Sequence, residues 1–464
     1  MTRSDVVGID PATLSGARVL VAGAGISGLA AAAALLDLGA RVTVTDAAPE
    51  RLTDLPAGAE PGADPDAVPA GTRLVVTGPG RRPDHPLVAV AAAAGIPMVG
   101  EPELAWWLGR HRTDPPAWLV VTGTNGKTTT TGMLAAMLRA AGADAVACGN
   151  IGYPVVEAVQ AGHPVLAVEL SSFQLHWSPS IRPAAGCVLN VAEDHLDWHG
   201  SMTAYAEAKA LALRGPIAVA GVDDPAAAAL LRRVPAGTRR VGVTLGEPAP
   251  DQLGIVADSL VDRAFGGGVL IEADAVHPPG PPGRTDALAA AALARAFDVS
   301  PAGIRAGLLD FRPGPHRSAD VGTVGGVRFV DDSKATNPHA AGAALSAQAG
   351  APVVWIVGGL LKGATVDELV ARHAARLRAA VVIGTDRREL TAALARHAPD
   401  LPVVEVVPGH DGPMRTAVRR AAALAHPGDV VLLAPAAASM DQFVDYAERG
   451  RAFAAAVAEL PGQR

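Results

Sequence analysis

The sequence predicts an α/β protein of three domains whose sheets are mostly parallel. Short apolar runs typical of buried strands alternate with Ala-rich helical patterns along the 464 residues, which is the element order of parallel α/β layers. Two Pro-containing segments, residues 112–116 and 311–315, interrupt this alternation. Because the chain is longer than one ordinary domain, we expect boundaries there and domains over residues 1–112, 113–310 and 311–464.

The predicted strands are rich in Val and Leu and are separated by helical patterns. They are Val19–Ala22, Val42–Thr45, Leu74–Thr77, Leu119–Thr122, Val165–Leu170, Gly186–Asn190, Val353–Val357, Val381–Ile383 and Val430–Leu433. Two stretches rich in Pro and Gly, residues 48–71 and 277–283, are expected to be loops or short irregular connections.

The composition excludes several classes of protein. Hydrophobic residues make up 49% of the chain, and its net charge of −7 gives no general attraction to nucleic acid or anionic membranes. Any anionic ligand must therefore be met by local basic groups or backbone N–H groups. Cys148 and Cys187 are expected to be buried thiols in a reducing compartment. Met1–Gly16 lacks an apolar signal core and no apolar run approaches the ~20 residues of a membrane span, so we expect a cytoplasmic protein without nucleic-acid or membrane partners.

A glycine loop, Thr122–Thr129, follows the apolar run Trp118–Val121 and opens a helical pattern. A strand, a tight turn and a helix N-terminus together cradle nucleotide phosphates, so this domain is predicted to be a P-loop-type ATPase. Lys127 would reach the transferred phosphate and the Thr128 hydroxyl would bind Mg²⁺. A glycine turn with a surface lysine is the alternative, and the flanking strand and helix disfavour it. The predicted ATP contacts are Gly123, Thr124, Asn125, Gly126, Lys127, Thr128 and Thr129.

A second glycine turn, Gly23–Gly28, follows the strand Arg18–Ala22, and Asp46 ends the next strand. This Rossmann-like arrangement, taken alone, predicts NAD. Such a turn binds any pyrophosphate, however, and Asp46 accepts hydrogen bonds from any diol or uracil N–H. We favour a nucleotide sugar over a dinucleotide because the ATP loop lies elsewhere, and glycines that serve only packing are the third alternative. The predicted ligand contacts are Ser27, Asp46, Gly78 and Gly80, the last two in a turn that follows another strand.

Polar side chains follow two further predicted strands. Glu169 ends one of them, and His195 lies in the run Asn190–Asp197 after the other. Since the strand ends of such a sheet converge beside the phosphate loop, Glu169 is expected to bind the Mg²⁺ of ATP and His195 a second metal or a phosphate. Taken alone, Glu169 has a solvated strand-end carboxylate as its alternative, and His195 has a capping or packed histidine. Lys209, on a helix pattern from Met202, would by itself be a solvated charge.

These motifs resemble those of the Mur ligases, ATP-dependent amide-forming enzymes of peptidoglycan synthesis, over nearly the whole chain. Residues 169–175, 331–337 and 438–443 are most similar to the D-glutamate-adding branch. The resemblance implies a UDP-binding first domain, a central ATPase domain and a Rossmann-like third domain that brings the amino acid. It implies ATP, two Mg²⁺ sites, UDP-N-acetylmuramoyl-L-alanine and D-glutamate as ligands, with a monomer as the expected state. An acyl phosphate would be the intermediate, and His195 is a candidate base for the amine.

The resemblance also implies roles for single residues. Lys209 lies four residues after Tyr205, the spacing of a carbamylated, metal-binding lysine in the family. The other implied ligand contacts are Asn150, Ser171 and His195 at the muramoyl substrate or second metal, Asp286, His316, Arg317 and Asp332 at the nucleotide, and Lys334, Thr336, Lys362 and Ser439 at D-glutamate. The chain departs from the family at Asp286, which is often Asn, and at Leu360 and Leu361, where an Asp usually precedes the basic residue.

Three other functions compete with a Mur ligase. An NAD-dependent oxidoreductase would leave the ATP loop unexplained, and a P-loop regulator or transporter subunit would leave the first and third domains unexplained. Folylpolyglutamate-type ligases share the central domain but lack a UDP-sugar domain, and they are the nearest enzymatic alternative.

Overall fold

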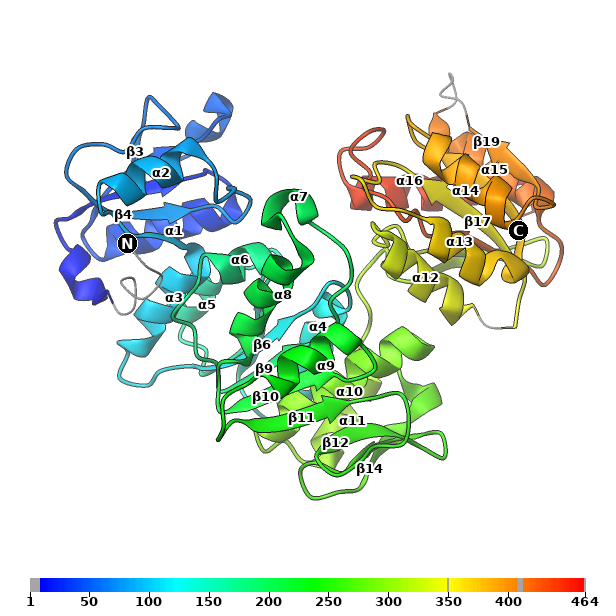
Figure 1. Ribbon diagram of the computed structural model, residues 1–464, viewed down its shortest axis with the longest axis horizontal. Helices are drawn as coiled ribbons and strands as arrows, with labels where there is room; N and C mark the ends of the chain where they lie inside the picture. Colours follow the sequence, from blue (N-terminus) through cyan, green and yellow to red (C-terminus); the bar gives the residue numbers. More distant parts are fainter. Residues whose placement is uncertain (1–8, 349, 407–411, 463–464) are drawn as a thin grey trace. The chain divides into compact units, whose positions relative to one another are not determined.

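The computed structural model describes residues 9–348, 350–406 and 412–462, and it contains three sheets (Figure 1). The predicted α/β class with mostly parallel sheets is confirmed. The first two sheets belong to one compact unit and the third to another, and the three domain boundaries remain a prediction. In the described part of the chain, no helix has the length and apolar character needed to cross a membrane. Cys148 and Cys187 are buried free thiols, as predicted.

The first sheet has five parallel strands in the order β3-β2-β1-β4-β5. Helix α1 starts directly after the first glycine turn, and a Cβ at Gly28 would lie 1.8 Å from the Gly23 carbonyl oxygen, so only glycine allows this close packing. The elements are η2 (Pro11–Leu14), β1 (Arg18–Ala22), α1 (Ile26–Asp37), β2 (Arg41–Thr45), η3 (Pro49–Leu52), β3 (Glu60–Pro61), β4 (Thr72–Thr77), α2 (Pro86–Ala93), β5 (Met98–Gly100) and α3 (Glu101–Arg110).

The second sheet has nine strands in the order β14-β13-β12-β11-β10-β9-β6-β8-β7. It is parallel except for the pairs β12–β13 and β13–β14. The elements are β6 (Ala117–Thr122), α4 (Lys127–Ala140), β7 (Ala145–Gly149), α5 (Val155–Gln160), β8 (Val165–Glu169), α6 (Ser172–His176), β9 (Ala185–Val188), α7 (Leu196–His199), α8 (Met202–Ala210), η4 (Leu211–Leu213), β10 (Ile217–Gly221), α9 (Pro225–Arg232), β11 (Arg239–Val243), β12 (Gln252–Val256), β13 (Ser259–Asp262), β14 (Val269–Glu272), η5 (Ala273–Ala275), α10 (Pro281–Ala296) and α11 (Pro301–Asp310).

The third sheet has the order β15-β16-β20-β17-β18-β19, with only β15–β16 antiparallel. Alternate residues of β17 pack into two different apolar cores. Val353 and Trp355 lie in one core, and Val354 and Ile356 lie in the other, so both faces of this sheet are covered. The elements are β15 (Ala319–Val324), β16 (Val327–Asp331), α12 (Pro338–Ala347), β17 (Val353–Gly358), α13 (Asp367–His373), η6 (Ala374–Arg376), β18 (Leu377–Ile383), α14 (Arg388–His397), β19 (Val403–Glu405), α15 (Pro413–Leu424), β20 (Val430–Leu433) and α16 (Tyr446–Ala458).

All nine predicted strands occur, with differences at their ends. The runs predicted to extend to Leu170 and Asn190 end at Glu169 and Val188, so Glu169 is the last residue of its strand and Asn190 follows its own. The two predicted loops are wrong in part. Residues 48–71 include η3 and the short strand β3, and α10 already begins at Pro281 because proline suits the first turn of a helix.

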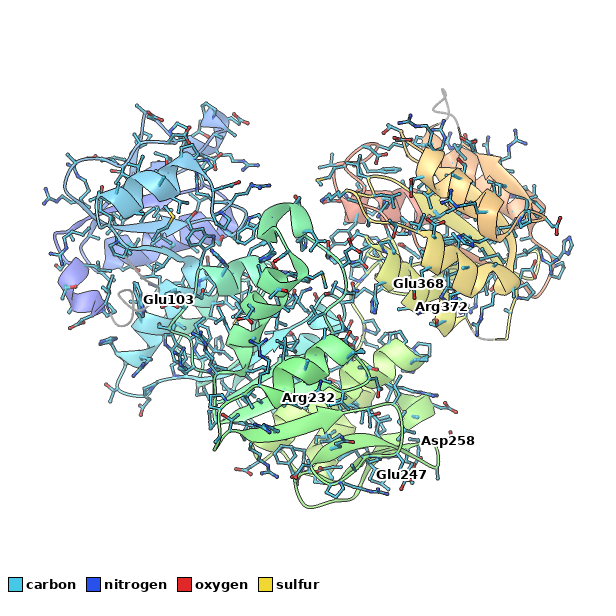
Figure 2. All side chains as sticks on the ribbon, in the orientation of Figure 1. Glu103, Arg232, Glu247, Asp258, Glu368 and Arg372 are labelled. Carbon is cyan, nitrogen blue, oxygen red and sulfur yellow. The ribbon has the colours of Figure 1, made fainter. Side chains whose placement is uncertain are left out.

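Two buried glutamates of α3 hold backbone amides of the second sheet's segments. Glu101 Oε1 accepts a hydrogen bond from Val156 N at 2.6 Å, and both Glu103 carboxylate oxygens accept from Ser180 N at 3.1 Å. Glu103 is 0% exposed and is labelled in Figure 2. Burial raises the pKa of each glutamate to about 7, although the hydrogen bonds oppose that shift. No sequence pattern indicated this pair, since both residues look like ordinary charges in a first helical turn.

We expect Glu103→Gln to change how stability depends on pH. Because the folded-state pKa of Glu103 is raised from 4.5 to about 7, its protonation stabilises the fold fully below pH 4.5, and this contribution is lost as the pH rises through 7. The variant carries no such group, so its stability relative to wild type should rise between about pH 5 and pH 7.5, by at most about 1.4 kcal/mol per pH unit. Urea unfolding of both proteins measures the difference. A difference independent of pH would contradict the expectation.

Candidate functional site

The phosphate loop occupies the turn between β6 and α4. Gly123 and Gly126 have φ values of 158° and 86°, and a Cβ at Gly126 would lie 2.2 Å from Asp286 Oδ1. Both the left-handed backbone and this close approach require glycine at position 126. The first turn of α4 therefore starts with its amides at the carboxyl edge of the sheet, which is where an anion is stabilised. Asp286 lies directly against this loop and also accepts a hydrogen bond from Thr130 Oγ1 at 3.2 Å.

Asn190 fixes the shape of the loop. Its Oδ1 accepts from Asn125 N at 2.9 Å, its Nδ2 donates to Asn125 O at 3.2 Å, and its backbone oxygen accepts from Thr124 N at 3.0 Å. Sequence analysis gave Asn190 no role of its own. The available signal was its position just after a strand that neighbours β6.

Two lysines converge on the carbonyl oxygen of Gly123. Lys127 Nζ donates to it at 3.0 Å and to Thr124 O at 2.9 Å, and Lys209 Nζ donates to it at 2.7 Å. Lys209 is 2% exposed and lies 4.4 Å from the centre of the Tyr205 ring, so the alternative of a solvated charge is wrong. Tyr205 in turn shares a 3.0 Å hydrogen bond with the Thr124 hydroxyl, which ties α8 to the loop.

Glu169 has one carboxylate oxygen satisfied and one not. Oε1 accepts from Asn150 Nδ2 at 2.9 Å, while the buried Oε2 has no hydrogen-bond partner among the described residues. The side chain is 1% exposed, so a solvated carboxylate is excluded. An unpartnered buried carboxylate oxygen is costly and fits a bound cation. The described residues contain no group of three or more His, Cys, Asp or Glu side chains suited to a metal, so Thr128, phosphate and water oxygens would complete the ligand set.

His195 begins α7 and has a left-handed backbone with φ 54°. Its ring centre lies 4.7 Å from that of Phe173, within a cluster of aromatic and histidine side chains. Burial, followed by nearby groups such as His176, lowers the pKa of His199 to about 4, so this neighbour is neutral at pH 7. Ser171 caps α6 by accepting from Gln174 N at 3.2 Å, and its predicted substrate contact remains a prediction.

The two glycine turns of the first sheet touch each other. Gly78 N donates to Ala22 O at 3.0 Å, and Gly23 N donates to Thr45 O at 2.7 Å. Asp46 accepts hydrogen bonds from Ala24 N at 2.7 Å and Ala48 N at 2.9 Å. Burial alone would raise the pKa of Asp46, but these amides and nearby arginines lower it. Asp46 therefore holds the first turn in shape, with Ser27 in the following helical turn and Gly80 exposed beside it.

Beside the third sheet, residues predicted to meet the nucleotide gather where the segment before β15 meets the end of β16. His316 Nδ1 lies 2.6 Å from Asp331 Oδ2, and a Cβ at Gly450 would lie 2.1 Å from the same ring nitrogen. Ser318 Oγ donates to Asp332 Oδ2 at 3.2 Å. Burial raises the pKa of Asp332 to about 7, against the opposing effects of Ser318 and Arg317.

A buried arginine that sequence analysis missed holds the segment 331–337 through Ser333. Arg449 is 1% exposed, and it donates from Nε to Ser333 Oγ at 3.0 Å and from a terminal nitrogen to Ser333 O at 2.8 Å. Burial lowers the pKa of Arg449 to about 10. Lys334 Nζ lies 3.8 Å from the centre of the Tyr446 ring, and Thr336 follows two residues later.

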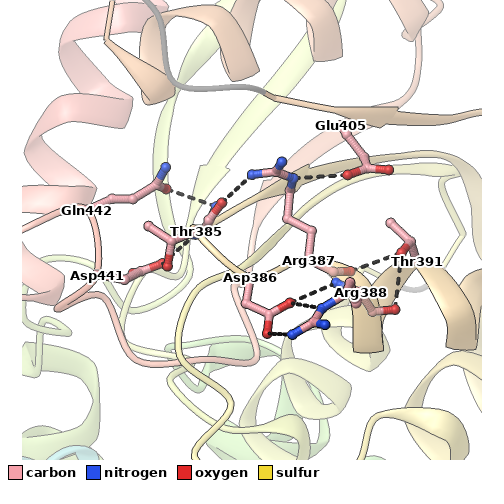
Figure 3. Close-up of polar contacts among 9 residues, drawn as sticks. Thr385, Asp386, Arg387, Arg388, Thr391, Glu405, Asp441 and Gln442 are labelled. Carbon is pink, nitrogen blue, oxygen red and sulfur yellow. Dashed lines mark hydrogen bonds and ion pairs between the residues drawn. The ribbon is translucent and has the colours of Figure 1, made fainter.

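Ser439 lies in a segment that side-chain contacts hold against the end of β18. Asp441 Oδ2 accepts from Thr385 N, and Gln442 Oε1 accepts from Gly384 N, each at 2.9 Å. Figure 3 shows Asp441 and Gln442 beside Thr385. Ser439 itself is 4% exposed. Lys362, after β17, is exposed and has a left-handed backbone with φ 53°.

The fold is that of an α/β protein, and the turn between β6 and α4 has the geometry of a phosphate-binding loop. The Mur ligase middle domain matches residues 121–259, and the Mur ligase glutamate ligase domain matches residues 316–437. The C-terminal domain of alanine dehydrogenase/PNT matches residues 4–61, the segment that carries the first glycine turn. This chain belongs to the Mur ligase family.

Curated relatives match nearly the whole chain. UDP-N-acetylmuramoylalanine–D-glutamate ligase of Nocardia farcinica is 54% identical, covering 96% of this chain and 97% of that protein, and the same-named protein of Streptomyces coelicolor is 52% identical, covering 97% and 99%. Two solved structures from Thermotoga maritima share the fold. UDP-N-acetylmuramate-alanine ligase has a TM-score of 0.56 at 18% sequence identity, and the match covers 95% of this chain and 99% of that one. MurF ligase in complex with ADP has a TM-score of 0.57 at 16% sequence identity, and the match covers 97% of each chain.

We expect Glu169→Gln to remove most of the Mg²⁺-dependent part of nucleotide binding, because the cation loses a charged oxygen ligand. Mg²⁺ with ADP should raise the melting temperature of wild type well above that of the variant, and the ADP affinity in Mg²⁺ should fall about tenfold or more. ADP with EDTA should act equally on both proteins. Glu157→Gln, at an exposed position of α5, is the matched control. Equal Mg²⁺ effects in wild type and Glu169→Gln would rule out this ligand.

Proposed function

We propose that this chain joins D-glutamate to UDP-N-acetylmuramoyl-L-alanine with hydrolysis of ATP to ADP, a step of peptidoglycan precursor synthesis. Its 54% identity to a ligase of that name over nearly the full length of both chains is the observation that carries the proposal. The phosphate loop with Lys127, the buried Glu169 and the residues after β16 supply the chemistry that such a ligase needs. We further propose that it acts in the cytoplasm as a monomer.

The chemistry starts from a carboxylate, which does not react with an amine in water until it is activated. The γ-phosphate of ATP passes to the L-alanyl carboxylate and gives an acyl phosphate, with ADP as the leaving group. The D-glutamate amine then attacks the acyl carbon and phosphate leaves. Loop residues 123–129 supply N–H groups and the α4 dipole to the phosphates, and Lys127 turns from its own loop carbonyls to the transferred group. His195 is a candidate to accept the amine proton.

Metal binding is assigned to residues at the edge of the central sheet. Mg²⁺ held by Thr128 and Glu169, with a second ion near His195 and Lys209, would lower the repulsion between two anions. We propose that Lys209 is carbamylated: its neutral amine adds CO₂ and loses a proton, which replaces a cation by a carboxylate-like anion. Lys209 is 2% exposed, and the step uses the neutral form of its amine.

Substrate binding is divided among the three predicted domains. The first would bind the UDP part through Ser27, Asp46, Gly78 and Gly80, and Asn150 and Ser171 would meet the muramoyl part. Asp286, His316, Arg317 and Asp332 would contact ATP. D-Glutamate would bind Lys334, Thr336, Lys362 and Ser439. Of these, the Lys362 ammonium and the Thr336 and Ser439 hydroxyls are the three anchors that fix one hand of the amino acid.

We expect ADP release from wild type only when UDP-N-acetylmuramoyl-L-alanine and D-glutamate are both present. L-Glutamate and L-alanine should give background rates, because neither satisfies all three anchors; one lost charge-assisted contact costs about 1.5–3 kcal/mol. A coupled ADP assay over a panel of amino acids measures this. Lys127→Ala is the control that should bind the UDP substrate and release no ADP. Turnover with L-glutamate equal to that with D-glutamate would reject the proposed specificity.

Lys209→Ala should lose most activity and regain part of it in millimolar acetate or formate, since a small carboxylate can take the place of the carbamate. The measurement is the ADP release rate against acid concentration at fixed pH and ionic strength. Chloride at the same ionic strength controls for salt, and Lys127→Ala should gain nothing from acetate. Full activity of Lys209→Ala without added acid would remove the role assigned to this lysine.

A further inference from the structure

Arg81 stands at the carboxyl edge of the first sheet, immediately after the second glycine turn. Gly78 of this turn donates to Ala22 O at 3.0 Å, so the loop lies beside the first glycine turn. Sequence analysis gave Arg81 no role, because one arginine in a Pro-rich loop resembles a surface charge. In the chain as a whole the net charge is −7, so an anionic ligand at this edge depends on local basic groups and backbone N–H groups.

The guanidinium of Arg81 is half-buried and only partly satisfied. One terminal nitrogen lies 3.0 Å from His85 Nδ1, while the buried Nε has no hydrogen-bond partner among the described residues. Asp46 and Asp66 are close enough to interact with it electrostatically. Burial lowers the pKa of Arg81, and these two carboxylates oppose the shift. Because the guanidinium is only half-buried, its accessible donors can meet an oxyanion, while the buried Nε would need a small movement of the side chain to do so.

Two tryptophans from the central sheet's helical segments hold the backbone of this loop. Trp198 Nε1 donates to Gly80 O at 3.2 Å, and Trp177 Nε1 donates to Arg81 O at 3.2 Å. Both tryptophans are 8% exposed. Trp198 belongs to α7, the helix that His195 begins, so the Arg81 loop and His195 are fixed to the same short segment. The loop is thus prearranged, and ligand binding need not order it.

The other basic residues near this edge are less suited to the same task. Arg51 has a side chain that is 60% exposed, and it lies 3.8 Å from Asp46. Arg82 has a 48% exposed side chain and pairs with Asp84 at 3.0 Å. Arg18 and Arg41 start β1 and β2, at the opposite ends of their strands. Arg81 alone among these five combines partial burial, an unused donor and a position beside both glycine turns.

We propose that Arg81 binds the diphosphate of the nucleotide sugar and so sets the affinity for the UDP substrate. The planar guanidinium suits phosphate oxygens, while the glycine turns contribute backbone N–H groups. This inference rests on the proposed function, because it takes the first sheet to hold the UDP part of the substrate. Arg81 does not touch the reacting carboxylate, so its effect belongs to binding.

The test compares Arg81→Gln, Arg81→Lys and Arg82→Gln with wild type. Calorimetry with UDP should show about 10- to 100-fold weaker binding for Arg81→Gln, a smaller loss for Arg81→Lys, and a change within about twofold for Arg82→Gln. Uridine, which lacks the diphosphate, should bind wild type and Arg81→Gln equally. In the ADP assay, the KM for UDP-N-acetylmuramoyl-L-alanine should rise by the same factor as the UDP Kd, with kcat and the KM for ATP nearly unchanged.

Two results would overturn the assignment. One is unchanged UDP binding by Arg81→Gln; the other is a lower kcat at saturating substrate with no change in UDP affinity, which indicates a structural role. Circular dichroism and thermal melting establish whether the variants are folded. If Arg81→Gln is not folded, the UDP affinity of Arg81→Lys tests the proposal instead. UDP binding requires no turnover, so it is judged separately from the proposed reaction. Failure of the reaction would appear as absent D-glutamate-dependent ADP release by wild type.

Discussion

The convergence of parallel strand ends is the constraint on which the central site depends. Strands β9, β6 and β8 are neighbours, and each stops before a polar segment. Their ends deliver Asn190, the phosphate loop and Glu169 to one edge of the sheet. The strands themselves are buried and largely apolar, so polar side chains are confined to their last residues and to the segments that follow. A shift of one strand register would move a catalytic group away from the others, which couples the sheet's packing to the chemistry.

The predictable part of this molecule is local in sequence. A strand, a glycine turn and a helix follow each other at the phosphate loop, so residues 118–129 are sufficient to predict it. Arg449 and Ser333 are 116 residues apart, and Glu103 and Ser180 are 77 apart. Such pairs depend on how sheets and helices pack, which no local pattern encodes. Arg449 and Glu103 therefore resembled ordinary surface charges of helices, although both are buried.

The first glycine turn shows why a correct local prediction can leave its ligand open. The strand, turn and helix exist as predicted, and Gly28 is required by its contact with the Gly23 carbonyl. Asp46, which in a dinucleotide site would meet a ribose, also accepts hydrogen bonds from two backbone amides. That structural task is the same for any ligand of the turn. The fingerprint consequently specifies a pyrophosphate-compatible turn, and the identity of the ligand depends on neighbouring groups such as Arg81.

The few lysines of this chain lie at positions that sequence analysis assigned to the site. The chain has 39 basic Lys and Arg residues, and its only lysines are Lys127, Lys209, Lys334 and Lys362. Arginine serves in exposed ion pairs such as Arg233–Glu207. A guanidinium stays protonated and cannot form a carbamate, whereas an ammonium is a compact charge that burial can neutralise. Replacing Lys209 by Arg would therefore keep the positive charge but remove the amine. The bulkier guanidinium would also crowd the Gly123 carbonyl oxygen, to which both Lys127 and Lys209 donate. Under the proposed carbamylation, the amine itself, more than its charge, accounts for a lysine at this position of an arginine-rich chain.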